Sequence, residues 1–143
     1  MQAGSGLLII ESTAVSKEGM ISKKDLSLYN KKNFLEFKKL FNYLRKISST
    51  KIGIQLSHSG RKGSSSLPWI KSNFPLKNKA GWKTMAPSKI KRDNHWPNPK
   101  EANLKDLNKI KLDFIKSTVY AKKIGFDCLE VHMAHGYLLH QFF

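Results

Sequence analysis

The sequence is poor in cysteine, arginine and acidic residues, and it has no long apolar run. Its single cysteine, Cys128, excludes an internal disulfide and is typical of a reducing compartment. No apolar run reaches the length of a membrane span, and the N-terminus lacks the charged start and cleavage site of a signal peptide. We therefore expect a cytoplasmic protein without a membrane partner, in which Cys128 packs as an inert thiol in a buried strand.

The charge is strongly unbalanced, with 26 Lys and Arg residues against 10 acidic ones and a formal net charge of +16. Only three of these cations are Arg, and the lysines are spread as single residues or pairs such as Lys23 and Lys24. A basic nucleic-acid-binding α/β module is the alternative that this charge raises. Because the cations are scattered rather than clustered, we expect solvated faces and no specific nucleic-acid partner.

Hydrophobic periodicity predicts alternating strands and helices. Periodicity predicts strands over about 6–12, 51–57 and 126–132, and the first is a short continuous apolar run typical of a parallel strand buried on both faces. A helix beginning near Asn30 or Asn33 and a second over 104–124, capped by Asn103, lie between them. The expected apolar stripes are Phe34, Phe37, Phe41 and Leu44 on the first helix, and Leu107, Ile110, Phe114 and Ala121 on the second.

This order predicts an α/β fold with a parallel sheet and right-handed crossovers, although periodicity cannot distinguish an open sheet from part of a barrel. The segment from 58 to 103 is too long for an ordinary connection and contains several Gly, Pro and Trp residues. We expect an elaborated loop at the carboxyl end of the second strand, with room for a short hairpin.

The most informative segment is 132–137, at the end of the third predicted strand. His132 and His135 lie three residues apart, Gly136 allows the backbone to turn, and Tyr137 follows. These groups can polarise a carbonyl and protonate the carbon beside it. A metal site formed by His132, His135 and His140 is the competing interpretation, but neither an HExxH helix nor a CxxC pair accompanies it. We expect no metal.

Three segments, 8–15, 54–62 and 132–142, closely resemble motifs of the old yellow enzyme family of NADH:flavin oxidoreductases, in the family's order and at about its spacing. The chain looks most like the bacterial xenobiotic-reductase branch, because Pro68, Trp69 and the segment 82–88 also fit. The resemblance implies a fragment of a (β/α)8 TIM barrel, with residues 1–143 forming a partial FMN-dependent oxidoreductase domain that carries strands 2 to 4. Such a barrel needs roughly 200 residues or more, so we expect the isolated chain to be inactive.

The resemblance also implies an activity and its partners. It implies reduction of activated alkenes, such as α,β-unsaturated carbonyl compounds, by hydride transfer from reduced FMN, with NADPH or NADH as reductant. The substrate is then a small molecule, and the full-length form is expected to be a homo-oligomer.

The roles of individual residues follow from the same resemblance. Gln55 would bind the flavin pyrimidine edge, and Ser12, where the family commonly has Ala, would face the flavin through its backbone. His132 and His135 would bind the substrate oxygen, and Tyr137 would protonate the α-carbon. His58 and Arg61 either contact ligands or stabilise the loop.

Overall fold

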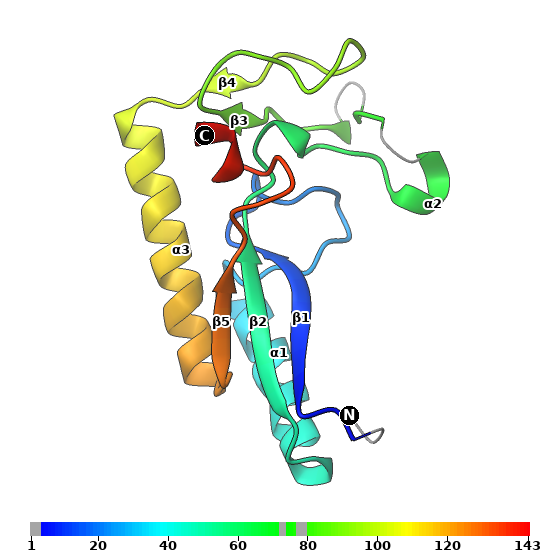
Figure 1. Cartoon of the computed structure of the whole chain (residues 1–143), viewed down its shortest axis with the longest axis vertical. Coiled ribbons are helices and arrows are strands. Elements are labelled where there is room, and N and C mark those ends of the chain that lie inside the picture. The colour runs from blue at the N-terminus through cyan, green and yellow to red at the C-terminus, as the bar shows by residue number, and fades with distance from the viewer. Residues whose placement is uncertain (1–3, 72–73, 77–79) are drawn as a thin grey trace.

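A three-stranded parallel sheet forms the centre of the protein (Figure 1). The computed structural model describes residues 4–71, 74–76 and 80–143. Strand β2 (Lys51–Ser57) lies between β1 (Leu7–Ala14) and β5 (Cys128–Val131), and both pairings are parallel. The prediction is confirmed for β2, whereas β1 extends two residues beyond Ser12 and β5 is shorter at both ends.

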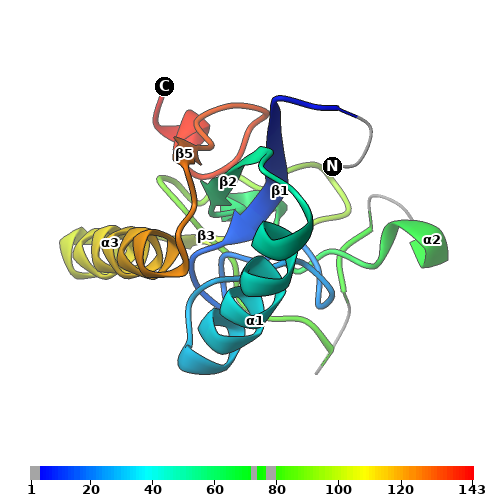
Figure 2. The same cartoon turned by 90° about the horizontal axis from the view of Figure 1, so that it is seen from below.

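Two long helices lie on the same face of this sheet (Figure 2). Helix α1 (Lys31–Ile47) begins after Asn30, whose side chain accepts a hydrogen bond from the Asn33 amide at 2.8 Å. This bond decides between the two predicted caps. Helix α3 (Leu104–Ile124) begins with the predicted cap, Asn103, and ends at a left-handed glycine.

The core fills the space between the sheet and the helices. The side chains of β2 alternate, so that Ile52, Ile54 and Leu56 point to the helices and are fully buried. The predicted stripe of α1 packs there in full, while on α3 Leu107 and Ile110 lie outside the cluster, although Ile110 is buried. The remaining core members are Val15, Leu28, Ala121 and Ile124, surrounded by Ile10, Phe114, Tyr120 and Phe126.

The two outer strands are more exposed than their apolar sequences predict. Leu7, Leu8 and Ile9 of β1 are exposed, and so is every residue of β5, including Cys128. The expectation of a buried Cys128 thiol was therefore wrong. Among the described residues no further strand pairs with the outer edge of β1 or of β5, and only Ala14, the last residue of β1, forms an isolated bridge there, with Ser27.

Neither of the two long helices covers the opposite face of the sheet, which we call the open sheet face. Gly53 and Gln55 alternate with the buried isoleucines and therefore lie on this face, where Gly53 is buried and Gln55 is partly exposed. In the parallel register Gln55 lies beside Glu130 of β5. This face and the carboxyl ends of the strands form the surroundings of the predicted site.

The long segment after β2 covers the carboxyl ends of the strands (Figure 1). It contains the short helices η1 (Gly60–Lys62) and α2 (Pro68–Lys71), and the two-residue strands β3 (Met85–Ala86) and β4 (Lys100–Glu101). Strands β3 and β4 pair in parallel. The chain that follows β3 must therefore return to the end at which β3 begins before β4 can pair with it in parallel. The short hairpin expected in this segment is present as an isolated antiparallel bridge between Ser65 and Pro75, where the Ser66 amide donates to the Phe74 carbonyl oxygen at 2.8 Å and the Leu76 amide donates to the Ser64 carbonyl oxygen at 2.7 Å. Among the described residues no helix is long and apolar enough to cross a membrane.

Candidate active site at the carboxyl ends of the strands

The turn after β5 places three rings together. The His132 amide donates to the Leu56 carbonyl oxygen at 2.9 Å and so continues the parallel ladder. His135 and Gly136 then adopt the left-handed conformation, with φ values of 55° and 68°. This conformation is uncommon for a residue other than Gly, and here it reverses the chain so that Tyr137 returns toward His132.

His132 is the centre of this ring cluster. Its imidazole centroid lies 4.8 Å from that of Tyr137 and 5.2 Å from that of His135, with steep interplanar angles of 76° and 89°. His132 is almost fully buried, whereas His135 is exposed. The structure therefore brings together all three residues that the sequence predicted for substrate contact and proton transfer.

The hydrogen bonds of His132 determine what its ring can donate. Its Nδ1 accepts a hydrogen bond from the Ala134 amide at 3.2 Å, so in the neutral ring the proton lies on Nε2. Burial lowers the pKa of His132, and the neighbouring His135 lowers it further. The ring is thus a neutral donor through Nε2–H at neutral pH.

Tyr137 is held as a protonated phenol. Burial raises the pKa of Tyr137 above its usual value of about 10, and the negative charge of Asp25 raises it further. The Lys62 ammonium lies 5.0 Å from the centroid of the Tyr137 ring and donates a 2.7 Å hydrogen bond to the His135 carbonyl oxygen. Lys62 therefore connects η1 to the turn that carries both His135 and Tyr137.

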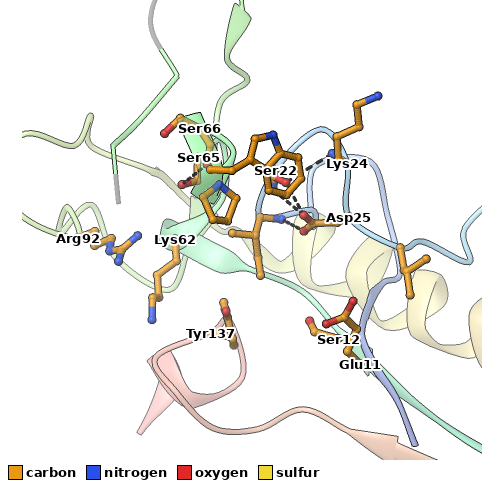
Figure 3. Close-up of a pocket in the computed structure, with 14 residues that line it drawn as sticks. Glu11, Ser12, Ser22, Lys24, Asp25, Lys62, Ser65, Ser66, Arg92 and Tyr137 are labelled. Atoms are coloured by element: carbon orange, nitrogen blue, oxygen red, sulfur yellow. Dashed lines mark hydrogen bonds between the residues drawn. The ribbon is translucent and has the colours of Figure 1, made fainter. Parts of the chain in front are cut away.

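Tyr137 lines a cavity of about 550 Å³. The cavity lies beneath the long segment, and Ser12 is on its wall near Glu11 (Figure 3). Its remaining lining residues are Ile21, Ser22, Lys24, Asp25, Leu26, Lys62, Ser65, Ser66, Pro68, Trp69 and Arg92. A cavity of this size can accept a small organic molecule.

The two predicted cofactor residues lie in different surroundings. Ser12 faces the cavity, and its hydroxyl is 2.6 Å from that of Ser57 at the end of β2. Gln55 does not line the cavity; it is on the open sheet face, where its amide nitrogen donates to a carboxylate oxygen of Glu130. Glu130 therefore orients the Gln55 amide and leaves its carbonyl oxygen available as an acceptor.

His140, the third residue of the alternative metal site, stabilises the turn after β5. Its Nδ1 accepts a hydrogen bond from the Gly136 amide at 2.8 Å. Gln141 also donates to the Gly136 carbonyl oxygen, at 2.7 Å. Over the described part of the chain, no group of three or more His, Cys, Asp or Glu side chains is arranged to hold a metal ion.

His58 and Arg61 have contacts that stabilise the long segment. His58 is fully buried, its Nδ1 accepts from the Gly60 amide, and burial lowers its pKa to about 4. The Arg61 guanidinium donates to the Ser88 hydroxyl at 3.3 Å. Neither residue lines the cavity, so of the two predicted roles the structure supports loop stabilisation.

The sequence reasoning missed the charged lining of the cavity. Lys62, Arg92 and Asp25 come from three segments that are separated in the chain, and no periodicity connects them. Of these three residues, only Lys62 could have been found from the sequence, because it is the last residue of the segment 54–62 that resembles a family motif.

A comparison with known families decides the assignment. The model of the NADH:flavin oxidoreductase / NADH oxidase family matches residues 1–143. The chain belongs to this family. It is 40% identical over 146 residues to an NADH:flavin oxidoreductase from Gibberella zeae, covering 99% of this chain and 35% of the relative. It is 39% identical over 139 residues to an NADPH dehydrogenase from Listeria monocytogenes, covering 97% of this chain and 36% of the relative.

A solved structure supports the fold of this family member. Morphinone reductase superposes with a TM-score of 0.80 over 98% of this chain and 38% of its own, at 22% identity. That likeness shows the fold of the matched region. In each of these comparisons the chain spans little more than a third of the other protein's length.

Proposed function

We propose that this chain carries part of the active site of an FMN-dependent NAD(P)H oxidoreductase that reduces alkenes activated by a carbonyl or nitro group. In this proposal, β1, β2 and β5 are strands 2 to 4 of a (β/α)8 barrel. The arrangement of both helices on one sheet face supports the proposal, since in such a barrel the helices form the outer layer and the opposite face lies inside.

The observation that carries the proposal is the contact between His132 and Tyr137. A neutral Nε2–H donor and a protonated phenol lie with ring centroids 4.8 Å apart at the carboxyl ends of parallel strands. In the reduction of an activated alkene, negative charge develops on the oxygen while the α-carbon receives a proton. A fixed donor at the oxygen stabilises that charge more in the transition state than in the ground state.

Each side chain then has one task. His132 and His135 together bind the substrate oxygen. Tyr137 delivers its hydroxyl proton to the α-carbon and regains a proton from solvent, which its raised pKa favours. Lys62 holds the turn through the His135 carbonyl oxygen and so fixes the position of Tyr137.

The residues present fit a flavin. FMN would supply the hydride, as the family description implies. Gln55 offers an oriented amide on the open sheet face, which suits the flavin pyrimidine edge, and Ser12 lies at the cavity wall beside it in the sheet. The relatives' names include both NADH and NADPH, so either nucleotide can be the reductant.

Flavin binding by a completed enzyme tests the proposal. The whole chain would replace the matched segment of the Listeria monocytogenes NADPH dehydrogenase, which supplies the remainder of the barrel. We expect a purified protein with a flavin absorption spectrum that is bleached by NADPH and recovers when an α,β-unsaturated ketone is added. A folded chimaera that binds no FMN, or whose reduced flavin does not react with the ketone, would contradict the proposal.

A further inference from the structure

The cavity beside Tyr137 is electrically polarised. Lys62 and Arg92 lie together at one end, next to Tyr137, whereas Glu11 lies at the other end with Ser12 (Figure 3). Lys24 and Asp25, whose charges are opposite, also line the cavity on the side of Glu11. Burial lowers the pKa of Lys62, and the neighbouring positive charge of Arg92 lowers it further. Two cations that lie side by side on the wall of a cavity repel each other, and an anion bound between them relieves this repulsion.

The nearby carboxylate of Asp25 does not form an ion pair with Lys62. Both oxygens of Asp25 are used within its own turn, where they accept hydrogen bonds from the Ile21 amide at 2.6 Å and from the Ser22 amide and hydroxyl at 3.1 and 2.6 Å. Among the described residues, Lys62 forms no ion pair with a carboxylate. Its one hydrogen bond, to the His135 carbonyl oxygen, leaves two ammonium protons for a ligand.

We propose that Lys62 and Arg92 form a subsite for an anionic group on the molecule that occupies the Tyr137 cavity. This inference rests on the proposed function, because it extends the same site. Tyr137 and Lys62 both line the cavity, and the Lys62 ammonium lies 5.0 Å from the centroid of the Tyr137 ring. A substituent on a molecule whose α-carbon meets Tyr137 would therefore lie beside this ammonium. The favoured substrates are activated alkenes that carry a carboxylate. A phosphate of the nicotinamide nucleotide is the other source of the same negative charge.

Two pairs of ligands, each with one anionic and one neutral member of similar size, test the subsite. In the chimaera described above, we would measure kcat/KM for monomethyl fumarate, an anion, and for dimethyl fumarate, which is neutral. Calorimetric titration with 4-hydroxybenzoate and 4-hydroxybenzamide gives binding without turnover. We expect Arg92→Gln to weaken use and binding of the anionic members by about tenfold, while the neutral members change less than about twofold. Lys62→Gln also removes the hydrogen bond that holds the turn, so both members should weaken, and the anionic member should weaken about tenfold more than the neutral one.

Two further variants serve as controls. Lys62→Arg keeps the charge and should retain most of the anion preference. Lys91→Gln removes an adjacent, exposed cation that does not line the cavity and should leave both ligands unchanged. Arg92→Gln matters because, unlike Lys62→Gln, it leaves the bond to the His135 carbonyl oxygen intact.

The outcomes separate the possibilities. If Lys62→Gln and Arg92→Gln lower only the rate of flavin reduction by NADPH, the subsite binds the phosphate of the reductant. Equal losses for charged and neutral ligands, or the same loss in Lys91→Gln, would overturn the subsite. Flavin binding and bleaching are recorded first on the same preparations. If the parent chimaera neither binds flavin nor shows bleaching by NADPH, the proposed function is wrong. If bleaching is normal but the variants weaken the anionic and neutral ligands equally, the subsite alone is contradicted.

Discussion

The imidazole of His132 meets the phenol of Tyr137 nearly at a right angle, with ring centroids 4.8 Å apart. The two residues are five positions apart in the sequence, and the left-handed backbone of His135 and Gly136 brings them into contact. An imidazole N–H donor and a protonated phenol are thereby fixed in one turn.

Removal of the Tyr137 hydroxyl should separate the two half-reactions. In Tyr137→Phe of the completed enzyme, flavin reduction by NADPH should proceed normally, because it needs no phenol proton. Alkene reduction should slow by roughly 10² to 10⁴-fold, the usual contribution of a positioned general acid. Stopped-flow absorbance resolves both steps. Unchanged alkene reduction would show that Tyr137 has no such role.

Loss of either histidine should weaken the hold on the substrate oxygen instead. His132→Ala and His135→Ala should reduce alkene reduction by roughly 10² to 10³-fold and weaken the binding of phenol-type ligands, since a developing negative charge loses a fixed donor. His95→Ala is the matched control, because His95 is exposed and lies outside the ring cluster of His132, His135 and Tyr137. Ligand affinity that is unaffected in His132→Ala and His135→Ala would rule out the assigned role.

His58 should make the stability of the protein depend on pH. Burial lowers its pKa to about 4 in the folded protein, against about 6.5 when it is unfolded. The unfolded state then binds more protons between these values, so stability is full above pH 6.5 and falls as the pH drops toward 4. The loss should reach roughly 3 kcal/mol, at about 1.4 kcal/mol per pKa unit.

Urea denaturation at pH 7 and at pH 5 measures this effect. Replacing His58 with Asn removes the titrating group, and the variant should lose less of its free energy of unfolding between the two pH values than the parent does. His95→Asn, at an exposed position, should behave as the parent. A parent and a His58→Asn variant with equal pH dependence would show that His58 does not remain neutral in the fold.

The isolated chain should self-associate. The apolar side chains exposed on β1 and β5, among them Ile9 and Val131, lie on strands whose outer edges pair with no further strand in the described structure. Light scattering should detect oligomers or aggregates that diminish in Val131→Lys, because a charge on an edge strand opposes pairing. Tyr43→Lys, at an exposed position on α1, should not have this effect. A monomeric parent chain would contradict the prediction.

The sequence by itself determined the elements and the chemistry of the turn. The apolar run of β2, the caps Asn30 and Asn103, and the order of strands and helices follow from local preferences that need no distant partner. The grouping of His132, His135 and Tyr137 was visible for the same reason, because all three lie within six consecutive residues.

Only the tertiary structure decided which apolar strands are covered and which charges share a cavity. Cys128 has the sequence surroundings of a buried thiol, yet it is exposed because no described strand lies beyond β5. Lys62 and Arg92 are thirty residues apart, and the fold of the long segment brings both to Tyr137. Burial and electrostatic repulsion depend on neighbours in space, and local sequence does not specify those neighbours.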